Sequence, residues 1–311
     1  MNDIKAVART ALSCLDLTSL NDGDTPEVID ALCDRALDNR LGVRPAAVCV
    51  YPKFVAQAVH RLQGSGIQVA TVVNFPHGGT HWDSIMADTQ RALADGADEI
   101  DFVIPFRTAI MGEMWIVRDL AEAMVRTCHT GEHPAHTKAI LETGALEDAP
   151  VIRRAAECVV EAGVDFIKTS TGKIQPAATM PVTLVMLEAI RDFYYKTGKM
   201  IGMKPAGGIR TAKQALHFLI AIKETLQYLR GRDRANVVGT LLAGVEAGGM
   251  DPSSVPVHET EAGALEAELR RQGVEASARL RVQHAREVIH VPARLQLGDV
   301  QSPGQRRQRE R

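Results

Sequence analysis

The sequence predicts an α/β protein built as a (β/α)₈ TIM barrel. From residue 12 to about 210, short runs rich in Val and Ile alternate with longer amphipathic stretches, as the βα units of a parallel sheet do. Polar residues lie within or at the ends of several apolar runs, and a barrel gathers the C-terminal ends of all its strands around one mouth. An open doubly wound sheet also fits the pattern, but it would spread these residues along a line.

Eight strands are expected in chain order. The first seven coincide with apolar runs, several of them continuous over four or more residues, as in strands buried on both faces. These runs are 13–18, 46–52, 67–76, 99–106, 137–144, 164–170 and 200–208. The eighth strand is expected in "NVVGTLLAGV" (236–245). The stretches between the runs predict helices, for example a helix from residue 83 that Gly96 ends.

The barrel domain is expected to span residues 1–245 and to begin with a short N-terminal helix. From Gly231 onward the chain has no Lys, no Cys and no aromatic residue, while Arg, Gln, Gly, Ala and Glu dominate. One segment there could form a helix, with Leu265 and Leu269 at i, i+4. We expect residues 246–311 to form an atypical, disordered C-terminal extension.

Charge and cysteine content limit the partners. The net charge of −2 and the pI near 6.6 provide no field that would hold nucleic acid or a membrane surface. No segment is apolar enough to span a membrane, so a small-molecule substrate is the expected partner. The five cysteines are scattered without paired spacing, which favours a reducing cytoplasm. The sequence leaves the oligomeric state open, with a homodimer as one candidate.

Two lysines lie at expected strand ends, Lys168 in "DFIKTSTGK" and Lys204 in "GMKPAGGIRT". A single lysine at such a position often only extends its amine to the rim. Neighbouring strands lie about 4.8 Å apart, however, so these two amines can approach each other. Asp101, inside the strand expected in "EIDFVIPF", can join them. The alternative for Asp101 is a carboxylate bound by backbone or water at the start of a loop.

A cluster of two lysines and an aspartate suits an amine that attacks a carbonyl. A lysine with a pKa near 10.4 is neutral in fewer than about one molecule in a thousand at pH 7, and only the neutral amine is nucleophilic. A neighbouring ammonium and partial desolvation both lower the pKa. The pattern therefore predicts one lysine that forms a Schiff base and a second that stays protonated and exchanges protons with Asp101.

Glycines mark a second candidate site. Gly207 and Gly208 follow the seventh expected strand directly, and Thr211 is a candidate N-cap for the next helix. Backbone N–H groups at a helix start, with Arg210 beside them, can cradle a phosphate. In a barrel, the loops after strands seven and eight are the usual phosphate position. A tight βα turn would use the same glycines, so both interpretations stay open.

No metal and no cofactor is expected. The histidines of "HGGTH" (77–81) and "HTGEHPAH" (129–136) lie in polar connections, without an H-E-x-x-H pattern or converging carboxylates. Cys49 lies inside an apolar strand, which is more typical of a small buried residue than of a thiol nucleophile.

Six segments together resemble the deoxyribose-phosphate aldolases, class I aldolases with a TIM-barrel fold: "LDLTSLND", "AAVCVYP", "VVNFPHG", "GADEIDFVIP", "DFIKTSTGK" and "GMKPAGGIRT". The resemblance runs from about residue 8 to about 225. It implies that Lys168 is the Schiff-base lysine and that Asp101 and Lys204 form a proton relay. It also implies substrate-binding or phosphate-binding roles for Asp16, Gly172, Lys173, Gly207, Gly208 and Arg210.

The reaction that this resemblance implies is the reversible cleavage of 2-deoxy-D-ribose 5-phosphate into acetaldehyde and D-glyceraldehyde 3-phosphate, in deoxyribonucleotide catabolism. The protonated Schiff-base nitrogen is the electron sink in such chemistry, so no metal is required.

The sequence departs from the family in the eighth strand. The family pattern "FGASSLL" completes the phosphate site, whereas this chain has "VVGTLLAG", in which Gly239 and Thr240 replace that pattern only in part. Divergence or a reading-frame shift near residue 226 would produce the change. The altered region motivates one alternative, a catalytically impaired aldolase-like barrel that only binds ligands or partners. A separate alternative is a barrel lyase that forms an iminium with a different phosphorylated sugar.

Overall fold

The computed structural model describes residues 4–131, 133–229 and 242–246. The chain divides into two units, Met1–Val255 and Pro256–Arg311, and the second unit lies wholly outside the described residues. The expected helix around Leu265 lies outside them too, as does the expected disordered extension apart from Glu246. The domain boundary after residue 245 stays a prediction.

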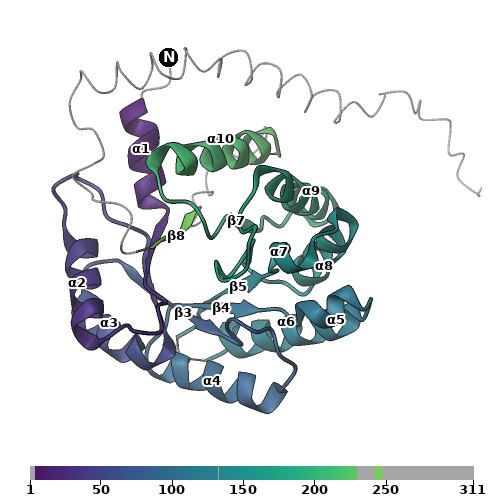
Figure 1. The fold of residues 1–311 in the computed structure, drawn as a ribbon, viewed down its shortest axis with the longest axis horizontal. Helices are drawn as coiled ribbons and strands as arrows, with labels where there is room; N and C mark the ends of the chain where they lie inside the picture. The colour runs from purple at the N-terminus through teal and green to yellow at the C-terminus, as the bar shows by residue number, and fades with distance from the viewer. Residues whose placement is uncertain (1–3, 132, 230–241, 247–311) are drawn as a thin grey trace, which may run out of the picture. The chain divides into compact units, whose positions relative to one another are not determined.

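Eight parallel strands form the sheet of the first unit (Figure 1), in the order β7-β6-β5-β4-β3-β2-β1-β8. They are β1 (Leu15–Thr18), β2 (Ala47–Val50), β3 (Gln68–Val73), β4 (Glu99–Val103), β5 (His136–Ile140), β6 (Phe166–Lys168), β7 (Gly202–Lys204) and β8 (Leu242–Glu246). Each strand overlaps the run from which it was expected, and the helices alternate with the strands along the chain. The predicted fold class, an α/β barrel of the TIM type, is confirmed.

Helices connect successive strands and flank the curved sheet (Figure 1). They are α1 (Ile4–Ser13), α2 (Pro26–Leu37), η1 (Pro52–Phe54), α3 (Val55–Leu62), α4 (Trp82–Ala94), α5 (Phe106–Ile110), α6 (Met114–His129), α7 (Thr143–Leu146), α8 (Ala149–Glu161), α9 (Met180–Thr197) and α10 (Ala212–Leu229). Helix α1 is the short N-terminal helix that the sequence predicts.

Helix α10 begins at the predicted cap. Thr211 Oγ1 accepts a hydrogen bond from the Gln214 N–H at 3.2 Å, and Gln214 Oε1 accepts one from the Thr211 N–H at 3.1 Å. This reciprocal pair is a capping box, which satisfies N–H groups that a helix start otherwise leaves without partners. The cap fixes the direction of the chain directly after the glycines that follow β7.

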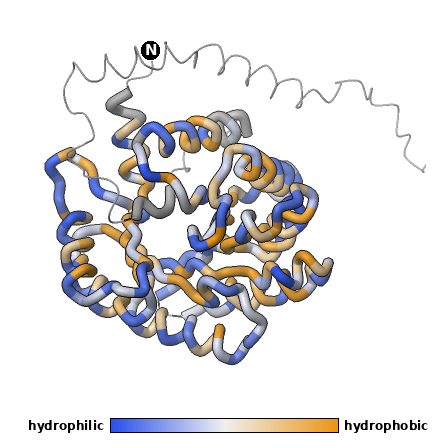
Figure 2. Tube along the Cα trace, in the orientation of Figure 1, coloured by the Kyte–Doolittle hydropathy of each residue, from blue (hydrophilic) through white to orange (hydrophobic). Residues whose placement is uncertain are grey.

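Apolar side chains fill two regions of the barrel. The larger one lies between the sheet and its helices. Along these helices, apolar and polar residues alternate, as Figure 2 shows. The smaller one consists of small or medium side chains on β2, on β3 and just after β1, with two aromatic rings packed against them. Its members are Leu20, Ala47, Cys49, Ala70 and Val72, with Tyr51 and Phe75.

The strand register determines which ionisable side chains meet. Asp101 lies opposite Lys138, and Lys168 lies opposite Lys204. Side chains two residues apart on a strand point to the same face, so Glu99 shares the face of Asp101. These residues therefore converge on one side of the sheet although they come from four different strands.

Gly202 is required where β7 packs beside β6. It lies opposite Phe166, and a Cβ at Gly202 would overlap the Phe166 ring. We predict that Gly202→Ala lowers the free energy of unfolding by about 1–3 kcal/mol, the usual cost of overpacking, as measured by denaturant titration.

Gly23→Ala is the matched control, because no heavy atom lies within 4 Å of a Cβ built there. Adding Phe166→Leu to Gly202→Ala should recover part of the loss. Equal stability of Gly202→Ala and Gly23→Ala would show that the two strands are not packed in this way.

Candidate active site

One carboxylate bridges two lysines inside the barrel. Asp101 Oδ2 accepts hydrogen bonds from Lys168 Nζ and from Lys204 Nζ, each at 2.7 Å. Lys168 is the last residue of β6, Lys204 is the last residue of β7, and Asp101 lies in the middle of β4. The placement of the two lysines at neighbouring strand ends thus brings their amines to the same oxygen atom.

Two further buried residues extend this cluster, and neither was singled out from the sequence. Lys138 Nζ donates a hydrogen bond to Glu99 Oε2, and it lies 3.2 Å from Asp101 Oδ1 and 3.5 Å from Asp16 Oδ2. Asp16 Oδ2 also accepts a hydrogen bond from Lys204 Nζ. Three lysines and three carboxylates therefore form one buried network with balanced formal charge.

A sequence signal for Lys138 did exist. Glu99 and Asp101 are two residues apart in one strand, so both carboxylates must point to the same buried face. Such a pair needs cations nearby, and Lys138 is a charged residue within the next predicted strand. The signal depends on knowing that this strand is adjacent and in which register it pairs, which the structure supplies.

The surroundings set the pKa of each lysine differently. Burial lowers the pKa of Lys168, and the neighbouring Lys204 ammonium lowers it further, against the opposing effect of Asp101. Burial would also lower the pKa of Lys204, but the carboxylates of Asp101 and Asp16 raise it above the usual value. In the same way, Asp101, Asp16 and Glu99 overcome burial and raise the pKa of Lys138 well above its usual value. Of these three amines, Lys168 is the easiest to deprotonate.

Lys168 also differs from the other two lysines in access. Lys168 keeps 4% of its residue surface exposed, whereas Lys138 and Lys204 have none exposed. A small carbonyl compound that enters the mouth of the barrel would therefore meet Lys168 first.

The acidic groups and the thiol in this region have perturbed pKa values as well. Burial acts to raise the pKa of Asp101, but Lys138, Lys168 and Lys204 hold it well below its usual value. Burial raises the pKa of the Cys49 thiol to about 11, so this thiol is protonated at neutral pH. Cys49 is thus a buried strand residue, and it is not activated as a nucleophile.

The predicted binding residues lie at the rim, where β6 and β7 end. Gly172, Gly207 and Gly208 have positive φ angles of 86°, 83° and 78°, which residues other than glycine rarely adopt. Lys173 Nζ donates a hydrogen bond of 2.8 Å to the Leu20 backbone carbonyl in the loop after β1. Arg210 is exposed at the start of α10. Asp16, by contrast, lies in the buried network.

The histidine segments do not come together around a metal site. Within the described residues, no group of three or more His, Cys, Asp or Glu side chains could hold a metal ion. His129 instead binds Asp165, with 2.7 Å between Nε2 and Oδ2. His136, at the start of β5, lies 3.9 Å from Glu99 Oε1.

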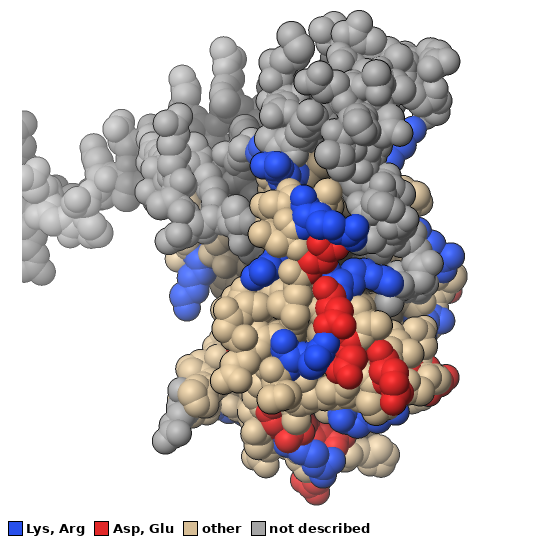
Figure 3. Space-filling view, turned by 90° about the vertical axis from the view of Figure 1, so that its left-hand side faces the viewer, with Lys and Arg blue, Asp and Glu red and all other residues tan. Residues whose placement is uncertain are grey.

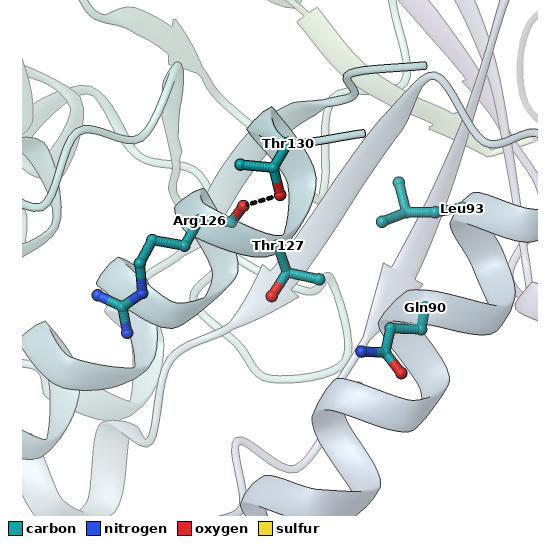
Figure 4. Close-up of a pocket in the computed structure, with 5 residues that line it drawn as sticks. All are labelled: Gln90, Leu93, Arg126, Thr127 and Thr130. Atoms are coloured by element: carbon teal, nitrogen blue, oxygen red, sulfur yellow. Dashed lines mark hydrogen bonds between the residues drawn. The ribbon is translucent and has the colours of Figure 1, made fainter. Parts of the chain in front are cut away.

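Two hollows have linings that do not include the lysine cluster. One of about 400 Å³ lies between α4 and α6, and Figure 4 shows the five residues that line it: Gln90, Leu93, Arg126, Thr127 and Thr130. Another of about 340 Å³ is lined by residues that include Tyr51, Phe75 and His77. Both have linings separate from the residues of the buried network.

The face drawn in Figure 3 has no large patch of side chains of one charge sign, because acidic and basic side chains are interspersed there. Ion pairs such as Arg61 with Asp30, at 3.5 Å, join α3 to α2. In the part of the chain that is described, every helix is too short or too polar to cross a membrane.

The parallel barrel, with a buried network of lysines and carboxylates that includes the last residues of β6 and β7, has a candidate site built on amines. Comparison with known protein families identifies the class of protein. The model of the DeoC/LacD family aldolases matches residues 10–245, and the chain belongs to this family of lyases.

Solved structures agree with this assignment. A candidate deoxyribose-phosphate aldolase from Toxoplasma gondii ME49 is 26% identical, with a TM-score of 0.67 over 79% of this chain and 94% of that chain. One from Coccidioides immitis is 27% identical, with a TM-score of 0.62 over 76% and 83%. The tetrameric deoxyribose phosphate aldolase of Aeropyrum pernix, 20% identical, shares the fold with a TM-score of 0.61 over 79% and 94%.

Lys204 contributes to the lowered pKa of Lys168, and this can be measured. We predict that Lys204→Met raises the pKa of Lys168, because the variant removes a neighbouring ammonium and leaves Asp101 to pair more strongly with Lys168. The measurement is the pH dependence of Lys168 methylation by formaldehyde and cyanoborohydride, followed by peptide mass spectrometry. Lys199→Met, at an exposed position, is the control. An unchanged or lower pKa in Lys204→Met would contradict the electrostatic arrangement described above.

Proposed function

We propose that this protein is a deoxyribose-phosphate aldolase, which cleaves 2-deoxy-D-ribose 5-phosphate reversibly into acetaldehyde and D-glyceraldehyde 3-phosphate. The observation that carries the proposal is the position of Lys168. Its amine has a lowered pKa and donates to an Asp101 oxygen that also binds Lys204. A nucleophilic amine next to a carboxylate and a second ammonium has the groups that Schiff-base chemistry needs.

In the cleavage direction, neutral Lys168 attacks the aldehyde carbon of the open-chain sugar to form a carbinolamine. Loss of water gives a protonated Schiff base. A base removes the proton of the C3 hydroxyl, the bond between C2 and C3 breaks, and its electron pair moves into the iminium to give an enamine. D-glyceraldehyde 3-phosphate leaves. Protonation of the enamine and hydrolysis then release acetaldehyde and regenerate the amine.

The two neighbours of Lys168 divide the proton transfers between them. Lys204 has a raised pKa, so it is protonated at neutral pH and can donate a proton to a carbinolamine hydroxyl. Asp101, whose pKa is well below its usual value, is ionised and can stabilise the iminium cation. Because Asp101 binds both amines, a proton lost by one can be returned through the carboxylate to the other.

The rim would bind the phosphate of the substrate. Backbone N–H groups around Gly172, Gly207 and Gly208 are free of Cβ atoms that would keep an anion away. Lys173 and Arg210 would supply positive charge there. Asp16 is buried among the lysines, so a direct contact between Asp16 and the sugar hydroxyls requires the substrate to reach the inner network.

The cellular setting follows from this chemistry. The substrate is a product of deoxynucleoside breakdown, so the reaction belongs to deoxyribonucleotide catabolism. The described cysteines are buried and none of them forms a disulfide, which suits a reducing cytoplasm. No cofactor is needed, because the iminium accepts the electron pair.

The central test is trapping of the Schiff base. Incubation with acetaldehyde and borohydride should add an ethyl group to Lys168, located by peptide mass mapping, and Lys168→Met should lose adduct and turnover together, by more than about 10³-fold. Lys53→Met, at an exposed lysine, should leave both unchanged. An adduct on a different lysine, or none, would refute the proposal. An adduct without turnover of deoxyribose 5-phosphate would instead favour the catalytically impaired barrel.

Arg210 tests the phosphate site. Arg210→Ala should raise KM for deoxyribose 5-phosphate about 10- to 100-fold, the value of one charge-assisted hydrogen bond. The variant should leave kcat/KM for unphosphorylated 2-deoxyribose unchanged, since that sugar carries no anion. Steady-state kinetics with the two sugars provide the comparison. Equal losses on both would show that Arg210 does not bind the phosphate.

A further inference from the structure

Glu142 is a buried carboxylate that the mechanism above does not use. It lies two residues after the end of β5, has no exposed surface and directly precedes the short helix α7. Its backbone is left-handed, with φ 55° and ψ 59°. A residue other than glycine in this conformation is strained, and such strain persists only where the surrounding structure imposes it. Something therefore holds this side chain where it is.

The partner of Glu142 is the loop that follows the Schiff-base strand. The Thr171 backbone N–H donates to both carboxylate oxygens, at 3.4 and 3.3 Å, and the Thr171 hydroxyl donates to Oε2. Bonds to a charged acceptor are about twice as strong as neutral ones. Through these bonds, Glu142 holds both the N–H group and the hydroxyl of Thr171 close to the end of β5.

Thr171 in turn contacts Lys173. Its hydroxyl oxygen accepts a hydrogen bond of 3.0 Å from the Lys173 N–H. The Lys173 side chain extends to the Leu20 carbonyl, 2.8 Å from Nζ. A continuous series of hydrogen bonds therefore leads from the Glu142 carboxylate to the position of an exposed ammonium at the rim.

The same loop is also held from its other side. A Cβ at Gly207 would lie 2.9 Å from the Gly172 Cα, so the loop is packed against the turn after β7. Backbone bonds of 2.9 Å from the Leu141 N–H to the Lys168 carbonyl, and from the Thr143 N–H to the Thr169 carbonyl, flank Glu142. With its backbone fixed on both sides, Glu142 can hold Thr171 in only one place.

We propose that Glu142 is a positioning residue that holds the loop of residues 169–173 so that the Lys173 ammonium faces the anionic end of the substrate. This inference rests on the proposed function, because it takes the phosphate of the sugar as the group that Lys173 binds. Glu142 would thus act on substrate binding through Thr171 and Lys173, without touching the substrate.

A double-variant cycle tests this coupling. In the otherwise native chain, Glu142→Ala should raise KM for deoxyribose 5-phosphate about tenfold, with a smaller change in kcat. In a Lys173→Met background, the same substitution should leave KM nearly unchanged, because the ammonium that it positions is gone. A KM increase of the same size in both backgrounds would show a general structural role and overturn the proposal.

Two further variants keep the test decisive. Glu147→Ala is the matched control: Glu147 lies at the other end of α7, is exposed and also has a φ of 55°, so it repeats the backbone strain without the buried carboxylate. If Glu142→Ala does not fold, Glu142→Gln replaces it, because the amide oxygen can still accept from Thr171. Its KM increase should be smaller and should again vanish with Lys173→Met. A KM increase of Glu142→Gln that persists in the Lys173→Met background would refute the proposal.

The failure of this inference differs from a failure of the proposed function. Trapping of acetaldehyde on Lys168 by borohydride depends on the buried amine and not on the rim, so it should persist in Glu142→Ala. Loss of trapping in this variant would mean that Glu142 supports the whole site, which overturns the positioning role. Absence of an adduct in the unmodified protein would refute the aldolase reaction itself.

Discussion

The site depends on the cost of burying charge. Each ammonium or carboxylate taken out of water loses several kcal/mol of hydration, which only good pairing restores. Asp101 meets this requirement for three lysines, since its two oxygens lie within 3.2 Å of Lys138, Lys168 and Lys204. Apolar residues of similar volume would stabilise a barrel interior at least as well. A buried network of this kind is therefore better explained by chemistry than by stability.

The pKa values of the three lysines differ because each lysine contacts a different number of carboxylates. Lys138 lies near Glu99, Asp101 and Asp16, and Lys204 binds Asp101 and Asp16. Lys168 binds Asp101. With fewer compensating charges, desolvation dominates at Lys168 and lowers its pKa, whereas the carboxylates dominate at the other two. One network thus holds an amine that is easier to deprotonate beside one that stays protonated, as the proposed Schiff-base chemistry requires.

Local patterns in the sequence were sufficient for the strands, the α10 cap and the positions of Lys168, Asp101 and Lys204. Each of these depends on hydrophobic periodicity or on residues close together in the chain. Lys138 and Glu99 were missed because their importance depends on register, which only the paired strands define. Glu142 lies within the run 137–144 that predicts the fifth strand, but its contact with Thr171 joins residues 29 positions apart. The departure in the eighth strand, "VVGTLLAG" (237–244), lies outside the described structure up to residue 241, which includes Gly239 and Thr240.

The apolar part of the interior completes the explanation of the reactive amine. Desolvation is the largest influence on the pKa of Lys168, and charged neighbours alone could not provide it. The small side chains of Ala47, Cys49 and Ala70 form an apolar cluster on β2 and β3, and the Cys49 thiol, protonated because of burial, adds no competing charge there. Low-polarity surroundings strengthen the charge interactions within the buried network. In the proposed aldolase reaction, the same apolar residues would exclude water from the enamine, so the surroundings that lower the pKa of Lys168 would also protect the proposed intermediate.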